Sequence, residues 1–391
     1  MDLRGTETER SFRTELRDWL SQAIPTVPPE PSPEDWAGRR AFDTAWQRLL
    51  HDAGYAGLTW PAEFGGRGSS PTEHLIFLEE TERAGAPYVG VNFVGLLHAG
   101  PTLIAEGTPS QRADHLLPIL RGEEVWCQGF SEPGAGSDLA SLQTKAARHG
   151  DDYVVSGQKI WTSFAHVADV CELLVRTDPA APKHRGITWL IMPMSSPGIE
   201  VRPMRTIAGS REFCEVFLDE VRVPVSNRVG EENDGWRVAM STLTHERVGT
   251  VTYGIQLRQK LEALLGREEA WPEDPVGRRL LGQAVADLWT RVEIIRLTAL
   301  RAVTKAARDE TPWPEVSIGK LLWSTVSQDL ASTAIRVLGP DGLRWPGDPE
   351  APDGGRWAFD EVQSRMTTIG AGTTEVQKNI LAERALGMPR G

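Results

Sequence analysis

The order of hydrophobic patterns along the chain predicts a mixed α+β protein in three parts: helical, then β, then helical. Over residues 1–121, apolar side chains recur at the three- and four-residue spacing of amphipathic helices. Over residues 122–232, short alternating or β-branched runs separated by turns replace that spacing. Over residues 233–391 the helical spacing returns. We therefore expect three domains with these bounds, and 391 residues are enough to give each a sizeable core.

The first part reads as a run of helices. Phe12, Leu16 and Leu20 share one face of the first, and a proline-rich connector follows it. Gly54 is expected to cap the second at its C-terminus. The expected helices of this part cover residues 7–24, 34–53, 72–84, 90–106 and 111–120.

The middle and last parts of the chain differ in the spacing of their apolar residues. The expected strands cover residues 125–130, 153–157, 170–176, 187–193, 199–204 and 213–223. The expected helices of the last part cover residues 236–265, 277–309, 316–339 and 375–386. A segment rich in Pro, Gly and Trp, residues 340–357, interrupts them; its length suggests that it is exposed or forms an interaction loop.

Bulk composition excludes several classes of partner. The net charge of −12 argues against nucleic acid, whose phosphates require a basic surface. No run reaches the roughly 18 apolar residues of a membrane span, so no membrane partner is expected. The three cysteines have no metal-like spacing and suggest a reducing compartment, with each thiol buried as a small hydrophobe. The charged first residues lack an apolar signal region, which favours a cytoplasmic location.

Two short motifs in the middle part point to a bound planar ligand. Residues 130–138 read Phe-Ser-Glu-Pro-Gly-Ala-Gly-Ser-Asp, in which Gly134 and Gly136 permit a tight turn whose N–H groups approach a ligand. Residues 157–163 read Gly-Gln-Lys-Ile-Trp-Thr-Ser, which places an aromatic plate two residues before a hydroxyl. Residues two apart in an extended strand share a face, so the plate could stack on a ring while hydroxyls contact its rim. The simpler interpretation is an ordinary loop followed by a core tryptophan.

Together the two motifs resemble the flavin-binding signature of the acyl-CoA dehydrogenase family, in the family's order and separation. The resemblance covers nearly the whole chain and includes Trp60–Gly66 and Gly372–Gln377. It implies an N-terminal α domain, a small middle β-barrel domain and a C-terminal four-helix bundle. It also implies that FAD is the cofactor. The implied flavin contacts are Phe130, Ser131, Gly136, Trp161, Ser163, Thr373 and Glu375.

What the resemblance implies about chemistry is α,β-dehydrogenation of an acyl-CoA thioester. A carboxylate removes a proton from Cα while a hydride leaves Cβ for flavin N5. Most family members carry this base just before the Gly-Thr near the C-terminus, where this chain has Ala371. A minority carry it on the first long helix of the C-terminal part, just before an arginine, and Glu246 falls on that position. We therefore expect Glu246 to be the base, although a Glu-Arg pair alone is usually a solvated surface pair.

The resemblance assigns the substrate contacts too. Arg247 would orient Glu246 or contact the pantetheine arm, and Ser137 would contact the CoA portion. The main-chain N–H of Ala371 would hold the thioester oxygen together with a flavin hydroxyl, a role that survives the loss of a carboxylate side chain.

Two departures from the family pattern concern the subunits. The Arg-x-x-Phe-Gly motif that reaches a neighbour's FAD diphosphate is missing from residues 256–262, and a glycine-rich adenine-side motif is altered at residues 336–342. We therefore expect a paralogous partner in an α2β2 heterotetramer, of the kind found in actinobacterial steroid side-chain degradation, with a homotetramer as the alternative. A steroid-CoA ester then becomes a candidate substrate, and electron-transfer flavoprotein is the implied electron acceptor.

Two other functions fit the same motifs. One is a non-catalytic assembly subunit that has lost its base at position 371, against which Glu246 argues. The other is an acyl-CoA oxidase or flavin monooxygenase on the same fold, in which oxygen takes the electrons. Generic apolar residues leave the acyl group, whether fatty, branched or steroid, undetermined.

Overall fold

The computed structural model describes residues 5–245, 250–308, 310 and 312–389, and the side chains of residues 244, 245, 250 and 251 fall outside that description. Contacts within the chain divide it into two units, which we describe separately. The bundle unit contains Met1–Thr14, Pro71–Arg83 and Val248–Gly391. The sheet unit contains Glu15–Ser70 and Ala84–Arg247. Helix α1 (Glu7–Ala23) contributes residues to both.

The sheet unit is built on one eight-stranded sheet of order β6-β7-β3-β2-β4-β5-β8, with β1 paired to β4. Its strands are β1 Trp126–Gly129, β2 Lys145–His149, β3 Asp152–Ser163, β4 Val170–Arg176, β5 Ile187–Pro193, β6 Ile199–Pro203, β7 Phe213–Pro224 and β8 Arg228–Val229. The predictions for β4 and β5 are confirmed to the residue. Sequence analysis missed β2, whose side chains are mostly polar and exposed, and the two-residue β8. It also made β3 too short.

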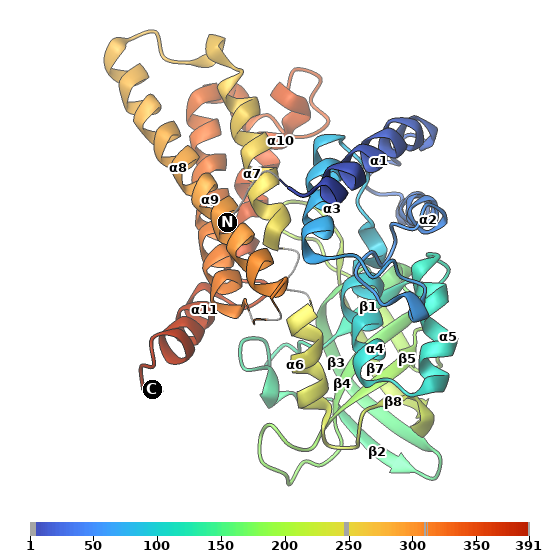
Figure 1. Cartoon of the computed structure of the whole chain (residues 1–391). Coiled ribbons are helices and arrows are strands. Elements are labelled where there is room, and N and C mark those ends of the chain that lie inside the picture. The colour runs from blue at the N-terminus through green and yellow to red at the C-terminus, as the bar shows by residue number, and fades with distance from the viewer. Residues whose placement is uncertain (1–4, 246–249, 309, 311, 390–391) are drawn as a thin grey trace. The chain divides into compact units, whose positions relative to one another are not determined.

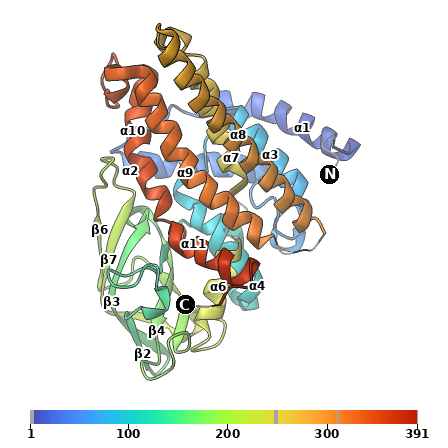
Figure 2. The same cartoon turned by 90° about the vertical axis from the view of Figure 1, so that its left-hand side faces the viewer.

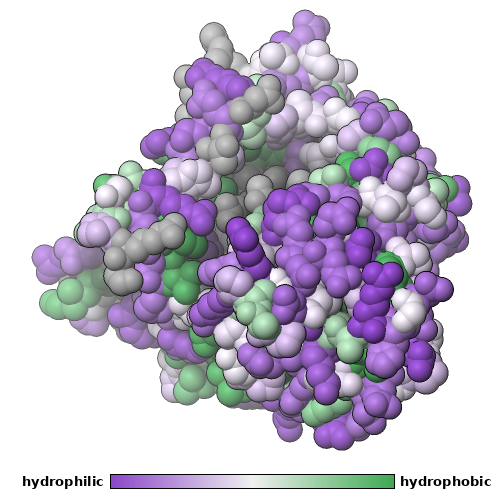
Figure 3. Space-filling view, turned by 90° about the horizontal axis from the view of Figure 1, so that it is seen from below, coloured by the Kyte–Doolittle hydropathy of each residue, from purple (hydrophilic) through white to green (hydrophobic). Residues whose placement is uncertain are grey.

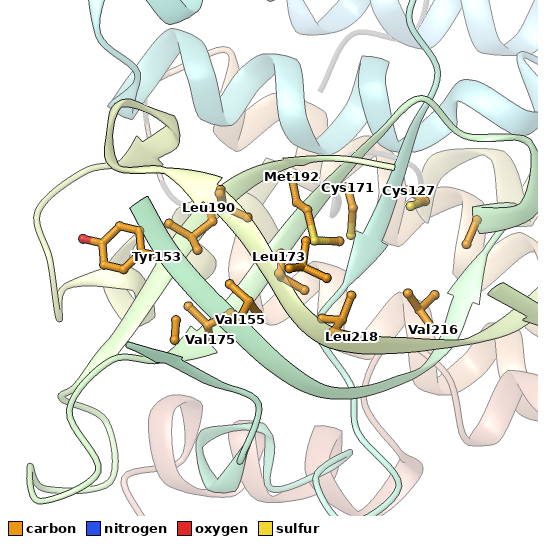
Figure 4. Packing of buried hydrophobic residues seen from close by; sticks show 14 of the residues in the cluster. Cys127, Tyr153, Val155, Cys171, Leu173, Val175, Leu190, Met192, Val216 and Leu218 are labelled. Carbon is orange, nitrogen blue, oxygen red and sulfur yellow. The ribbon is translucent and has the colours of Figure 1, made fainter. Parts of the chain in front are cut away.

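Strands β1, β3, β4, β5 and β7 all contribute to one buried core, so the sheet curls around its own apolar side chains (Figure 4). Cys127, Cys171 and Cys214 belong to this core and are buried free thiols, as predicted. Burial raises the pKa of Cys214 to about 11 and raises that of Cys127. The thiols of Cys127 and Cys214 therefore stay protonated, and all three cysteines serve as packing groups in the core.

Besides the end of α1, the described residues of the sheet unit form α2 (Trp36–Asp52), α4 (Gly100–Glu106), α5 (Pro109–Leu120) and α6 (Gly235–His245); α2, α4 and α6 are labelled in Figure 2. The chain is helical throughout residues 90–106, as predicted, but the helix is irregular: a 3₁₀ turn at Gly90–Asn92 and a π turn at Gly95–Ala99 precede α4. Pro101 lacks an N–H and stands at the junction of the π turn with α4, where it removes one donor from the helical ladder. Thr108 and Gln111 form a reciprocal capping box that starts α5.

The bundle unit contains α3 (Pro71–Arg83), α7 (Thr250–Leu265), α8 (Pro275–Ala306), α9 (Trp313–Leu338), α10 (Arg356–Gln363) and α11 (Thr374–Ile380) (Figure 1). Helices α7 to α10 share one apolar core. Sequence analysis missed α10, which follows the Pro/Gly/Trp-rich segment. Trp357 on α10 is 1% exposed and donates to the Asp353 carboxylate, so the end of that segment is anchored rather than loose. Its middle is exposed, with Leu343 at 66%.

No helix among the described residues combines the length and apolar character needed to cross a membrane. On the face drawn in Figure 3, hydrophobic side chains are scattered among hydrophilic ones.

Candidate functional site

The first predicted motif forms a tight two-residue turn in the sheet unit. Glu132 and Ala135 exchange both main-chain hydrogen bonds at 3.0 Å, with Pro133 and Gly134 at the tip. Pro133 presets its own φ for such a turn. The turn immediately follows β1, so the sheet fixes where it begins.

A buried ion pair joins this turn to the second motif on β3. Lys159 Nζ lies 2.9 Å from Glu132 Oε1 and donates to the Phe130 carbonyl at 3.1 Å. Lys159 is fully buried and Glu132 is 8% exposed. The Glu132 carboxylate also accepts the N–H groups of Gln143 at 2.6 Å and Thr144 at 2.8 Å. Burial alone would raise the pKa of Glu132, but the Lys159 ammonium and these donors lower it, so the carboxylate stays ionised.

Trp161 on β3 is exposed rather than buried in the core. Its side chain is 58% exposed, which argues against the simpler interpretation of a core tryptophan. The pairing of β3 with β7 shifts register between Lys159 and Thr162, and Trp161 has φ +61° within that bulge. A left-handed conformation is costly for a residue with a Cβ, so the surrounding sheet holds it there. Phe213 on β7 meets the indole edge-on, with ring centroids 5.8 Å apart. Bulge and neighbour together fix an exposed aromatic plate.

The two serines predicted to contact a flavin, Ser131 and Ser163, lie next to the turn and to Trp161 along the chain. The Ser131 carbonyl accepts the Ile160 N–H at 3.0 Å, which ties the first motif to β3 directly. Ser163 stands at the end of β3, two residues after Trp161, and is half-buried like Ser131. Within the described parts of the chain, neither serine hydroxyl forms a hydrogen bond, so both can serve a ligand. The expectation that Trp161 and Ser163 share a face assumed a regular strand, and the bulge replaces that geometry.

The glycines of the turn leave open space. Neither Gly134 nor Gly136 has a positive φ, and a Cβ built on either would meet no atom within 4 Å. The chain itself therefore gives no reason for glycine at these positions, whereas a ligand resting against the turn does. Gly157 differs: its φ is +158°, and a Cβ there would meet Thr144 Oγ1 at 2.5 Å. An open glycine turn, an exposed indole plate and unused hydroxyls together fit a flat ring with polar edges.

A Cβ would meet open space at Gly136 but would collide with Thr144 at Gly157, which predicts opposite results for the two alanine substitutions. We expect Gly136→Ala to keep the thermal stability of the ligand-free protein or raise it slightly, by about 0.4–1 kcal/mol, because alanine reduces the freedom of the unfolded chain. We expect it to weaken flavin retention, measured by visible absorbance after gel filtration. Gly157→Ala should lower the melting temperature instead, since it collides with the Thr144 side chain and main chain. Undiminished flavin retention by Gly136→Ala would contradict the assignment.

A pocket of about 530 Å³ lies against the same turn, lined by residues 132–135, 141, 143, 144, 157 and 158. None of the predicted flavin contacts lines it, so it carries no assignment.

Ala371, whose N–H was predicted to hold the thioester oxygen, lies in the bundle unit, in a turn between α10 and α11. Ala371 and Gly372 are consecutive left-handed residues, with φ +52° and +83°. The Ala371 carbonyl accepts from Gln377 Nε2 at 3.1 Å, and the Gly372 carbonyl accepts from Lys320 Nζ at 2.6 Å. Thr373 caps α11 by accepting the Val376 N–H, which places Glu375 in its first turn. Side chains therefore hold the backbone that would present the Ala371 N–H.

Glu246 and Arg247, the predicted base and its neighbour, lie outside the described residues. Helix α6 leads directly to them and is anchored at both ends. At its start, Gly235 packs on the main chain of β5, where a Cβ would meet Trp189 N at 2.5 Å. Near its end, the Thr102 hydroxyl on α4 lies 2.9 Å from the Thr242 hydroxyl, and both side chains are fully buried.

The class of fold is defined by three parts in this order: a helical N-terminal part, a β domain that carries the two motifs, and a helical C-terminal part. Three family models match the chain: the N-terminal domain of acyl-CoA dehydrogenase at residues 6–123, the middle domain at 127–221 and the C-terminal domain at 233–386. The chain therefore belongs to the acyl-CoA dehydrogenase family, a class of flavoprotein oxidoreductases.

Individual relatives match over nearly full length. The chain is 41% identical to acyl-CoA dehydrogenase IpdE1 of Mycobacterium tuberculosis, with 97% of each chain covered. Its fold matches the solved structure of the Tcur3481-Tcur3483 steroid ACAD with TM-score 0.88 at 34% identity, covering all of both chains. It matches the ChsE4-ChsE5 complex of Mycobacterium tuberculosis with TM-score 0.85 at 34% identity, again over both full chains. The family prediction made from the motifs is confirmed.

Proposed function

We propose that this chain catalyses FAD-dependent α,β-dehydrogenation of an acyl-CoA thioester, with Glu246 as the base that removes the α-proton. The observation that carries the proposal is the exposed, strained Trp161 beside the unused hydroxyls of Ser131 and Ser163. Such an arrangement costs folding free energy, and the two hydroxyls have no hydrogen-bond partner among the described residues. A stacked flavin would supply one.

The protein's own groups divide the work. Glu246 would accept the α-proton, and Arg247 would orient its carboxylate. The Ala371 N–H would donate to the thioester oxygen, which makes the α-proton more acidic by stabilising the charge that develops there. Ser137 would contact the CoA portion. FAD, when bound, supplies the hydride acceptor; Phe130, Ser131, Gly136, Trp161, Ser163, Thr373 and Glu375 would hold it.

We further propose a paralogous partner subunit, in an α2β2 assembly. Two arginines near the altered family motifs, Arg258 and Arg344, are paired with carboxylates of their own chain. Arg258 lies 2.9 Å from Glu262 and 2.8 Å from Glu293. Arg344 is paired with carboxylates at positions 341, 348 and 350. Both guanidiniums are therefore neutralised within the chain, and Arg336 in the second altered motif donates to the Thr333 hydroxyl. We propose that a second chain supplies the cationic partner of the FAD diphosphate.

The names of two similar structures agree with such a partner, since each names two proteins. One is described as a steroid ACAD. A steroid-CoA ester is accordingly the substrate class that we propose to test first, with electron-transfer flavoprotein as the electron acceptor.

The test compares the chain purified alone with the chain co-expressed with a paralogue from its own organism. We expect the co-expressed complex to retain FAD and to lose its visible flavin absorbance when a steroid-CoA ester is added without oxygen. The chain alone should retain less than one FAD per subunit. A tetramer of this chain alone, fully loaded with FAD, would contradict the heteromer. A loaded complex that no acyl-CoA bleaches would contradict the dehydrogenase and favour an assembly subunit, and stoichiometric peroxide formation in air would favour an oxidase.

A further inference from the structure

Lys320 is a buried lysine that the reaction as described does not use. It lies on α9, is 4% exposed, and stands one helical turn from Val316 and Ser324, which are both buried. Its Nζ donates to the Gly372 carbonyl at 2.6 Å. Among the residues that the structure describes, Lys320 forms no ion pair. Burying an ammonium group is costly, and an apolar side chain would pack on this face of α9 at lower cost. The lysine therefore serves the turn it contacts.

That turn has an unfavourable backbone held by two side chains. Ala371 adopts a left-handed conformation at φ +52°, which is costly for a residue with a Cβ. Gln377 holds the carbonyl of Ala371, and Lys320 holds the carbonyl of Gly372. These carbonyls belong to the peptide planes on either side of Gly372. The Ala371 N–H belongs to the preceding plane, so the two bonds act on its direction through the backbone dihedrals of Ala371 and Gly372.

The Lys320 contact also places charge behind the turn. Burial lowers the pKa of Lys320, and the Glu375 carboxylate opposes that shift. An ammonium directed at a main-chain carbonyl creates positive potential at the turn. Such potential favours negative charge developing nearby.

We propose that Lys320 is a positioning residue for the dehydrogenation: by holding the Gly372 carbonyl, it fixes the left-handed turn that presents the Ala371 N–H to the thioester oxygen. This inference rests on the proposed function, because it concerns the donor assigned there to the thioester. It adds a group on α9 that touches neither flavin nor substrate.

The test replaces Lys320 by methionine, which keeps the length of the side chain and removes the charge and the donors. In the FAD-loaded complex, we expect the rate constant of flavin reduction to fall by about tenfold to a hundredfold, as for a misplaced reacting group. KM, FAD content and melting temperature should change little. Exchange of the α-hydrogens of a non-oxidisable acyl-CoA with deuterated water should slow by the same factor, because it reports polarisation of the thioester without hydride transfer. Amide hydrogen exchange over residues 366–377 should become faster.

Lys378→Met is the matched control. Lys378 lies on the neighbouring α11 and is exposed, so the same substitution there should leave all of these quantities unchanged. If Lys320→Met does not fold, Lys320→Gln is measured instead. Its neutral amide is one bond shorter than the lysine side chain, so it removes the charge and falls short of the Gly372 carbonyl, and the same slowing is expected.

The outcomes separate the two proposals. If the parent complex neither bleaches with any acyl-CoA nor exchanges α-hydrogens, the proposed function fails. If the parent does both and the Lys320 variants match it in rate and in amide exchange, the positioning role of Lys320 is overturned while the proposed function stands.

Discussion

Replacing Glu246 by glutamine is expected to abolish measurable bleaching of the flavin by acyl-CoA. General bases contribute about 10²–10⁴ to rate, and here no carboxylate stands at position 371 to substitute. An amide of the same shape cannot accept the α-proton at neutral pH, so the loss should reach about a thousandfold or more. Single-turnover mixing of the FAD-loaded complex with its acyl-CoA, without oxygen, measures the rate directly.

The control for this prediction must show that the site is otherwise intact. Glu246→Gln should keep its FAD content and should still bind a non-oxidisable acyl-CoA. Glu231→Gln makes the same chemical change at a side chain that is 86% exposed and should bleach at the parental rate. Flavin reduction by Glu246→Gln at the parental rate would contradict the assignment of Glu246 as the base. The base would then have to be sought elsewhere in the chain.

A second experiment asks whether the base can be moved. Ala371→Glu restores a carboxylate at the usual family position, and if the turn tolerates it, Glu246→Gln combined with Ala371→Glu should regain part of the lost rate. The left-handed φ of residue 371 makes any larger side chain strained there, so recovery is expected to be incomplete.

The parts of the site that could be predicted from sequence are those where residue type alone limits the choice. Pro133 and Gly134 predict a tight turn, and the structure has one. Strands β4 and β5 could be bounded to the residue because both are mainly apolar runs between turns, and the structure buries every residue of each except the last.

Other parts depend on tertiary pairing, which a local pattern does not contain. The bulge at Trp161 arises from a register shift against β7, more than 50 residues later in the chain, so the indole's exposure could not be read from its neighbours. Strand β2 is polar because most of its side chains face outward, and only its pairing with β3 makes it a strand. The bounds of the three domains and the roles of the site residues stay predictions.

The burial of one charged side chain, Lys159, could have been predicted from the sequence. Tyr153, Val155 and Lys159 occupy inward positions along β3, and a lysine in an inward position requires an acceptor when it is buried. The preceding motif supplies a single carboxylate between its hydrophobic start and its glycines, Glu132. Alternation combined with charge would therefore have found the Glu132–Lys159 pair, which was not predicted.

That pair supports the second large prediction. Lys159→Met should destabilise the sheet unit by about 3–5 kcal/mol, because it leaves a buried carboxylate without its counter-ion. The shift of the urea midpoint of the sheet unit's unfolding transition measures this, together with the flavin content of the purified complex. Flavin retention should fall as well, since the pair connects the turn to the strand that carries Trp161 and Ser163.

A second ion pair close to the same turn serves as the control. Lys183 pairs with Asp138, which follows the turn in the chain, but these side chains are 50% and 58% exposed. Exposed pairs contribute about 0–1 kcal/mol, so Lys183→Met should move the midpoint little. Glu132→Gln combined with Lys159→Met should recover part of the stability lost in Lys159→Met, because it removes the uncompensated charge. Equal midpoints for Lys159→Met and Lys183→Met would mean that the turn and β3 are held together by packing alone, and the ion pair would then have no part in building the flavin site.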